Sequence, residues 1–203
     1  MPMTLRMTTS FRATRVRITA QQVPARRDRG LTLIELMVGL SVLAIAMALS
    51  APQFGQWGRS TRAVTQGADI QNALAYARSE SLRRGVRVAI CRTAAPRAAN
   101  PSCSDTASWA EGWLVFVDNV QVTGNTAGAV DGTDTVLRIG DALSGATVDV
   151  TGNLGAWVAY SPQGLIRTAG GPANGSLRVC QSPHARRISL SGAGMATGTN
   201  EAC

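Results

Sequence analysis

The sequence predicts an α+β protein in which a long N-terminal helix packs on an antiparallel β-sheet domain. Up to Gly85 the apolar residues recur with helical spacing, and beyond it they alternate with a period of two. Glycine-rich turns, such as the one at 161–164, divide this later part into short segments. About 120 residues remain for the β domain, which suffices for a modest hydrophobic core.

Residues 1–30 form a basic leader. They hold seven arginines and one acid, Asp28, whereas residues 31–203 hold thirteen arginines and eleven acids. The net charge of +8 therefore falls to about +2 once the leader is set aside. A charge of +8 alone would suggest a nucleic acid or an anionic membrane as the partner. Here most of the basic charge belongs to the leader.

Residues 31–51 are apolar except for Glu35 and a few hydroxyl side chains. Twenty helical residues span about 30 Å, the thickness of a bilayer core, so we expect a transmembrane helix. The leader arginines should keep its N-terminal end in the cytoplasm and place the rest of the chain in the periplasm. A secretory signal peptide is the alternative, but its apolar stretch is shorter, about 7–15 residues. Pro52 directly after Ala51 also disfavours cleavage there.

Residues 52–84 continue the helical pattern as an amphipathic half. We expect Pro52 to bend or interrupt the helix. Arg83, Arg84 and the following Gly85 are typical of a helix C-terminus. The predicted inward face consists of Phe54, Trp57, Val64, Ile70, Leu74, Ala77 and Leu82.

Residues 85–203 are predicted to form the antiparallel β domain. The candidate strands cover 86–92, 112–118, 135–139, 147–151, 157–161, 176–180 and 187–191. Residues 122–134 and 168–176 are expected to be glycine-rich loops.

The chain has four cysteines, an even number that favours disulfides in a domain outside the cytoplasm. Three pairings are possible, and proximity in the sequence favours Cys91–Cys103 and Cys180–Cys203. Free buried thiols are the alternative. A zinc site is disfavoured because the sequence lacks a C-x-x-C motif and His184 is its only histidine.

Residues 30–36, GLTLIEL, resemble the processing motif of type IV prepilins and type II secretion pseudopilins. The resemblance implies that the membrane prepilin peptidase cleaves after Gly30 and that Leu31 is then N-methylated. That family usually has phenylalanine at the first mature position, so the leucine is a departure, although a hydrophobic one. Pro52 is the twenty-second residue after the implied cut, where type IV pilins commonly carry a proline.

Glu35 is the one charged side chain inside the apolar stretch. A carboxylate at the centre of a membrane span costs roughly 2.5–3.5 kcal/mol on insertion scales, so it is rarely found there without a partner. Cleavage after Gly30 would create an ammonium group at Leu31, four residues before Glu35. We therefore expect Glu35 to pair with the N-terminal amine of a neighbouring subunit in a filament. The alternative is a carboxylate that reaches back to the membrane interface.

Residues 112–118, GWLVFVD, look like the G-W-x-V-F-x-D strand of the GspH/FimT family of minor pseudopilins. Later segments also resemble that family, at 136–138, 160–164, 177–180 and 185–188. The resemblance covers about residues 29–191 and implies a type IV pilin-like fold. It implies a structural subunit in the bacterial inner membrane that joins other major and minor pilins and helps to start a filament. No cofactor is implied, and type II secretion and type IV pilus machines both remain open.

DNA uptake is the alternative function, because some FimT-type minor pilins bind DNA through a basic segment after the last strand. Here residues 192–198 contain no arginine. Arg178, Arg186 and Arg187, together with Arg167, could still form a patch, since phosphate binding needs clustered cations. Ordinary surface arginines are the simpler interpretation, and we do not expect DNA as a partner.

Enzyme motifs are missing from the sequence. It contains no G-x-S-x-G and no H-E-x-x-H, and without lysine it cannot form a P-loop, so we predict no catalytic residue. Oxygen-bearing side chains between 118 and 134 could bind Ca²⁺, but they are also typical of turns and do not match an EF-hand, so no metal site is predicted. These residues are Asp118, Asn119, Asn125, Asp131 and Asp134.

Overall fold

The structure, a computed structural model, describes residues 30–203, without the side chains of residues 49–56. Residues 1–29 of the predicted leader lie outside the described residues. The chain divides into two compact units, Met1–Ala46 and Met47–Cys203, each of which is described by itself.

Helix α1 runs from Leu33 to Arg84. It begins at Leu33 because Thr32 caps it: the Thr32 hydroxyl accepts a hydrogen bond of 3.3 Å from the backbone N–H of Glu35. It ends where Gly85 adopts a φ of +66° and donates its N–H to the Ser81 carbonyl at 3.0 Å. The helix continues through Pro52, so the proline does not interrupt it. The φ of proline is helical, so a helix can continue through it, although it loses one N–H donor and its ring crowds the carbonyl four residues earlier.

In the first unit, α1 has an apolar surface that is exposed to solvent. All side chains from residue 30 to residue 46 are exposed. Within the part of the chain that is described, no helix is long and apolar enough to cross a membrane. Side chains 49–51 of the predicted span fall outside that part, and the membrane span at 31–51 stays a prediction.

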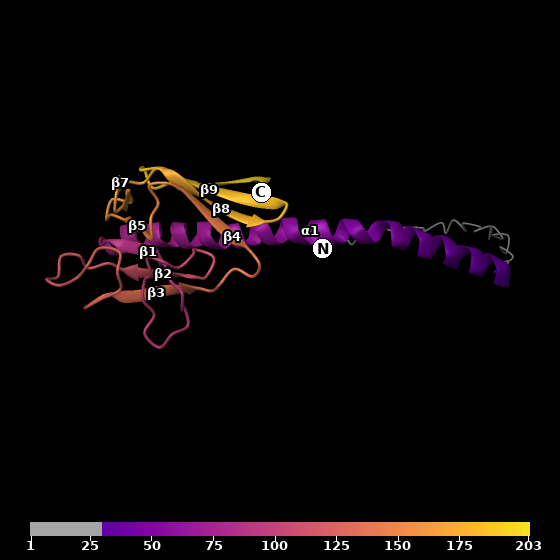
Figure 1. Cartoon of the computed structure of the whole chain (residues 1–203), viewed down its shortest axis with the longest axis horizontal. Coiled ribbons are helices and arrows are strands. Elements are labelled where there is room, and N and C mark those ends of the chain that lie inside the picture. Colours follow the sequence, from indigo (N-terminus) through magenta and orange to yellow (C-terminus); the bar gives the residue numbers. More distant parts are fainter. Residues whose placement is uncertain (1–29) are drawn as a thin grey trace, which may run out of the picture. The chain divides into compact units, whose positions relative to one another are not determined.

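The second unit contains two antiparallel sheets (Figure 1). A six-stranded sheet has the order β3-β2-β1-β5-β6-β7, and a four-stranded sheet has the order β10-β9-β8-β4. The strands are β1 (Val88–Arg92), β2 (Trp113–Val117), β3 (Thr135–Gly140), β4 (Thr147–Gly152), β5 (Trp157–Tyr160), β6 (Ile166–Thr168), β7 (Gly171–Pro172), β8 (Gly175–Gln181), β9 (His184–Leu190) and β10 (Ala196–Ala202).

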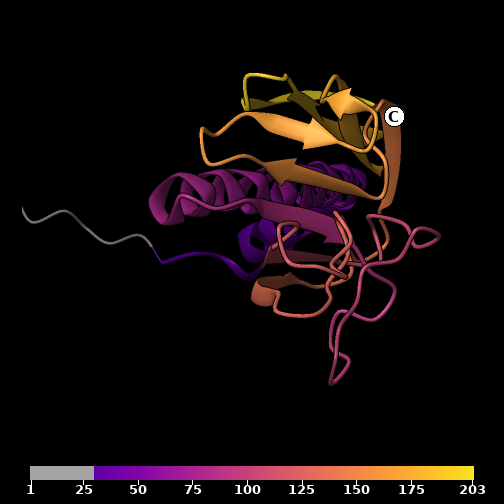
Figure 2. The same ribbon diagram turned by 90° about the vertical axis from the view of Figure 1, so that its left-hand side faces the viewer.

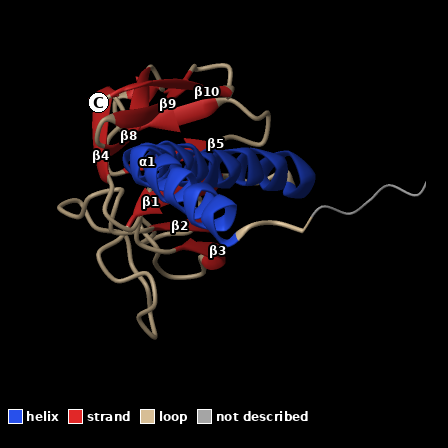
Figure 3. Cartoon of the chain, turned by 90° about the vertical axis from the view of Figure 1, so that its right-hand side faces the viewer, coloured by secondary structure: helices blue, strands red, loops and turns tan. Residues whose placement is uncertain are grey.

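The C-terminal half of α1 lies between the two sheets, as Figures 2 and 3 show from opposite sides. One core cluster joins the three layers. Ile70 and Leu74 of the helix pack with Ile90 of the six-stranded sheet and Leu177 and Ile188 of the four-stranded sheet, and all five are fully buried. The predicted α+β architecture, a helix packed on antiparallel β-structure, is confirmed. The division of the β domain into two sheets around the helix was not predicted.

The inward face of α1 differs in part from the prediction. Ile70, Leu74 and Ala77 are buried, but Trp57 is 72% exposed and Leu82 is 52% exposed. Val64 is half-buried, and the side chain of Phe54 lies outside the description. The prediction left out three small residues that are buried on this face beside Ile70 and Leu74: Ala63, Gly67 and Ala73. Small side chains let the sheets approach the helix closely.

All seven predicted strands are present, with ends shifted by up to three residues. Three strands were not predicted. β6 and β7 form a small hairpin that begins in the expected connection after 161 and ends inside the loop expected at 168–176. β10 starts inside segment 192–198, which follows the last predicted strand. β10 has no alternating apolar pattern, and its seven residues all pair with β9.

A smaller cluster covers the outer face of the six-stranded sheet. Phe116 and Leu114 of β2 are fully buried there, against Val130 and Trp157. A disulfide between Cys91 of β1 and Cys103, with Cα atoms 5.6 Å apart, attaches the 93–112 connection to this face. Both faces of the sheet are therefore buried, which accounts for the continuous apolar sequence of β2.

Candidate functional site

The segment that resembles a processing motif lies at the start of α1. Gly30 and Leu31 precede the helix and are exposed, and a Cβ atom on Gly30 would meet no atom within 4 Å. Glu35 occupies the first turn, where its backbone N–H is capped by Thr32. Among the described residues its carboxylate forms no ion pair. The three residues that the sequence singled out therefore lie within two turns, accessible to another molecule.

The surface around Glu35 is apolar on every side of the helix. A helix that is apolar all round is stable in water only where something else covers it. This surface is formed by large side chains that are 50–80% exposed: Leu31, Leu33, Ile34, Leu36, Met37, Val38, Leu40, Val42, Leu43 and Ile45. We call residues 30–46 the assembly segment.

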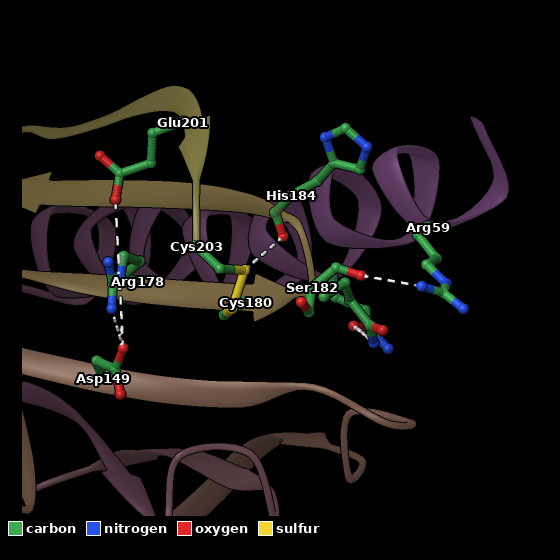
Figure 4. The surroundings of a disulfide bond; sticks show 10 residues. Arg59, Asp149, Arg178, Cys180, Ser182, His184, Glu201 and Cys203 are labelled. Atoms are coloured by element: carbon green, nitrogen blue, oxygen red, sulfur yellow. Dashed lines mark hydrogen bonds and ion pairs between the residues drawn. A yellow bond between two sulfur atoms is a disulfide. The ribbon is translucent and has the colours of Figure 1, made fainter. Parts of the chain in front are cut away.

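Two of the three arginines of the possible DNA patch lie on the outer face of the four-stranded sheet. Arg178 of β8 and Arg187 of β9 are directly opposite each other in register. Arg178 pairs with Asp149 at 2.6 Å and Arg187 with Glu201 at 2.7 Å, and Figure 4 shows the acids on either side of Arg178. The hydrogen bond from Arg187 lowers the pKa of Glu201, so the acid stays charged. Both guanidinium groups are thus neutralised locally.

The third arginine, Arg186, points to the opposite face of the sheet, because successive side chains of a strand alternate. It lies over α1, where a Cβ atom on Gly67 would come within 2.8 Å of the Arg186 Cδ. Its guanidinium donates to the side chains of Gln71 at 3.1 Å and Asn200 at 2.9 Å. Arg167 belongs to β6 of the other sheet. The structure therefore does not bring these arginines together as one cationic patch.

Groups of the oxygen-rich loop after β2 donate hydrogen bonds to the acids of the same loop, although Oδ1 of Asp131 is buried without a partner among the described residues. Asp134 accepts hydrogen bonds from the backbone N–H groups of Asn119 and Asp131, at 2.8 and 3.3 Å, and from the Asn125 amide at 3.3 Å. Asp131 accepts one from the N–H of Thr126 at 2.8 Å. In the described part of the chain, no group of three or more His, Cys, Asp or Glu side chains is placed to hold a metal ion. These oxygens act as turn-forming acceptors.

Asp118 has a different role in the same loop, which sequence analysis missed. Its side chain is completely buried and accepts hydrogen bonds from Arg87 at 2.8 Å and from the backbone N–H of Gly128 at 3.0 Å. Burial raises the pKa of Asp118, while the charge of Arg87 opposes that rise. The Arg87 guanidinium also lies 5.0 Å from the centre of the Trp157 ring. The sequence did contain a signal for this buried ion pair: Asp118 directly follows the continuous apolar residues of β2.

A second disulfide joins Cys180 at the end of β8 to Cys203 after β10, with Cα atoms 5.7 Å apart (Figure 4). The backbone N–H of Cys203 also donates to the Pro183 carbonyl at 2.9 Å. Both disulfides have the pairing that proximity in the sequence favours. The first attaches the 93–112 connection to β1, and the second attaches the end of edge strand β10 to β8. No cysteine of the described chain is left free.

The fold and the assembly segment define a pilin-like subunit: a helix with an uncovered apolar start whose second half is enclosed by antiparallel β-structure. The chain belongs to the family of the type II transport protein GspH, whose family model matches residues 66–194. The prokaryotic N-terminal methylation motif matches residues 25–51. This is a family of minor pilins and pseudopilins, which are structural proteins.

No curated protein matches the chain. Two crystal structures of the type IV minor pilin FimU from Pseudomonas aeruginosa, in space groups P21 and P65, are similar to it at 16% and 17% sequence identity. The similarity covers 68% of this chain and 87% and 95% of those chains, with a TM-score of 0.49 in both cases.

Proposed function

We propose that the chain is a minor subunit that helps to start a periplasmic filament, in a type II secretion pseudopilus or a type IV pilus. The observation that carries the proposal is the assembly segment: an apolar helix surface with a single carboxylate, attached to a domain that has its own closed core. The family match supports the same class of protein.

In this proposal the prepilin peptidase cleaves after Gly30 and Leu31 is N-methylated. The match of residues 25–51 to the methylation motif supports the step, as does the exposure of the cleavage position. Residues 31–51 then hold the subunit in the inner membrane, and the disulfide-bonded domain lies in the periplasm, where disulfides persist.

Glu35 is proposed to guide assembly. Its carboxylate lies in an apolar surface and has no ion-pair partner among the described residues, so an amine from a neighbouring subunit would offset the cost of burying it. The Leu31 ammonium group formed by cleavage is such an amine. The arginines give no comparable support for DNA uptake. Arg178 and Arg187 are neutralised by acids, and Arg186 points to the opposite face of the four-stranded sheet.

Glu35→Leu tests the assembly role. The variant removes a charge from the predicted membrane span, so insertion should be as good as in wild type or better. Incorporation into filaments should fall, as measured by cross-linking to the other pilins in sheared filament fractions. Asp69→Asn removes another exposed carboxylate of α1 and is the matched control, which should assemble normally. Wild-type assembly of the Glu35→Leu variant would rule out the pairing.

Gly30→Val tests the processing step. A branched residue should not fit a peptidase that needs a small residue before the cut, so the variant should keep its leader while remaining in the membrane. Intact-mass analysis of extracted wild-type protein should give a chain that begins with methylated Leu31. A mature chain that begins after Ala51 would contradict the proposal.

A further inference from the structure

We propose that the start of the periplasmic domain binds the anionic lipid headgroups of the membrane in which the subunit is anchored. The surface consists of Trp57, Arg59 and Arg62 of α1 with the β8–β9 turn at Ser182 and Pro183, and we call it the lipid-facing end. The inference rests on the proposed membrane anchor at 31–51 and adds a partner for a surface that the filament role does not use.

Trp57 is the first observation. Its side chain is 72% exposed, whereas Trp109 and Trp113 are buried and Trp157 is half-buried. The domain thus leaves one tryptophan side chain of its four largely uncovered. Tryptophan is enriched at membrane interfaces because its ring is apolar and its N–H needs a polar partner.

The charge of the lipid-facing end is the second observation. Arg59 and Arg62 are exposed, and the sequence has no acid between Glu35 and Asp69. Arg59 donates a long hydrogen bond of 3.4 Å to the Ser182 carbonyl, and Arg62 has no ion pair among the described residues. Figure 4 shows Arg59 extending to Ser182 at the end of the β8–β9 hairpin. By contrast, Arg178 and Arg187 are matched with acids.

The distance along the helix places Trp57 and the reach of Arg59 at headgroup height. Six residues separate Trp57 from the end of the predicted span at Ala51, which corresponds to about 9 Å of helix. The headgroup layer extends about 5–7 Å beyond the hydrocarbon core. Side chains of a helix lean toward its N-terminus, here toward the membrane, and arginine stems can extend the guanidinium several ångströms further. Trp57 can therefore enter the layer, and the Arg59 side chain, which starts about 12 Å beyond the span, can reach phosphate groups. Arg62, about 16 Å beyond the span, adds positive charge within about two Debye lengths of the membrane surface.

The hydrogen bond between Arg59 and Ser182 brings the β8–β9 turn to the same level. Ser182 and Pro183 are exposed, and the turn contains no acid. A helix and a hairpin thus form the surface together, so lipid binding would fix how the domain is oriented above the membrane.

The test uses the full-length protein in vesicles of phosphatidylcholine, with or without phosphatidylglycerol and with or without brominated acyl chains. The Trp57 signal is the difference in emission between wild type and Trp57→Phe. We expect this signal to be shifted to shorter wavelength and mostly lost with brominated lipid, with greater loss when phosphatidylglycerol is present. The double variant Arg59→Gln/Arg62→Gln should lose the effect of phosphatidylglycerol, as should wild type in high salt.

Arg167→Gln, which removes an exposed arginine of β6, is the matched control and should behave as wild type. Resistance to alkaline extraction is measured on every sample. Protein that stays in the vesicles with Trp57 emission unaffected by brominated lipid would overturn the inference and leave the anchor intact. Protein that is extracted would overturn the proposed anchor, and the inference with it.

Discussion

The two ends of helix α1 have opposite relations to the rest of the chain. Between residues 57 and 84 the helix buries Ile70, Leu74 and Ala77 in a core shared with both sheets. In the assembly segment at 30–46, every side chain is exposed although most are apolar. The difference teaches that one part of the helix is stabilised within the chain, whereas the other is left uncovered by the described residues and, in the proposed function, is covered by the membrane and by other subunits.

Charged side chains show the same contrast. Asp118 is fully buried and held by Arg87 and a backbone N–H. Glu35, in the assembly segment, forms no ion pair within the described chain. Substitutions in the β domain should therefore change the free energy of unfolding, and those in the assembly segment should change assembly instead.

The largest effect is expected from Arg87→Met. It leaves the buried carboxylate of Asp118 without its cation, which costs about 3–5 kcal/mol of unfolding free energy when a buried pair is broken. Urea denaturation of the detergent-solubilised protein, followed by tryptophan fluorescence, measures this loss. Glu35→Leu should leave the same transition unchanged.

The double variant Arg87→Met/Asp118→Leu is the control, because it removes both charges and should recover part of the lost stability. An Arg87→Met variant as stable as wild type would show that the pair contributes nothing to the fold, and the contrast between the two regions would lose its electrostatic part.

A leucine-to-alanine pair compares the apolar contacts. Leu74→Ala opens a cavity in the shared core and should lower the unfolding free energy by about 2–5 kcal/mol. Leu40→Ala removes the same atoms from the assembly segment and should change the unfolding of the β domain by less than about 0.5 kcal/mol. Equal losses in the two variants would mean that the assembly segment also packs within its own chain.

The smallest effect is expected in the stability of the protein at low pH. Hydrogen bonds from Arg83 and Arg84 lower the pKa of Glu80 from 4.5 to about 2. The unfolded chain therefore takes up this proton first, so the contribution of Glu80 is complete above pH 4.5 and is lost as the pH falls toward 2. Glu80→Gln should flatten the pH dependence of unfolding in that window. An unchanged slope would show that Arg83 and Arg84 do not hold the carboxylate in solution.

The helix, the seven apolar strands and the disulfide pairing were accessible from the sequence because each leaves a local pattern. Helical spacing marked Ile70 and Leu74, and continuous apolar residues marked β2. Position in the sequence alone favoured Cys91–Cys103. The family was also predictable, since its motifs at 30–36 and 112–118 are short and contiguous.

Features that depend on distant contacts were not predictable. β10 is polar and exists because β9 pairs with it. The separation of Arg186 from Arg187 follows from strand alternation. The predicted strand at 187–191 left Arg186 out because it started three residues later than β9 does. Trp57 was placed inward because it is apolar, but it lies beyond the end of the buried face, whereas Gly67, which was left out, lies on that face under Arg186.

The position of α1 between two sheets also determines how the subunit carries mechanical load. A pull on the N-terminal end enters the β domain along the helix axis, so the packed layers on both sides must slide together and not separate one strand at a time. The helix cannot slide out without breaking the hydrophobic contacts of Ile70, Leu74 and Ala77 in the core that both sheets share, and resistance to forced unfolding is set by the unfolding rate. A filament subunit built in this way would resist extraction along the direction in which it is anchored.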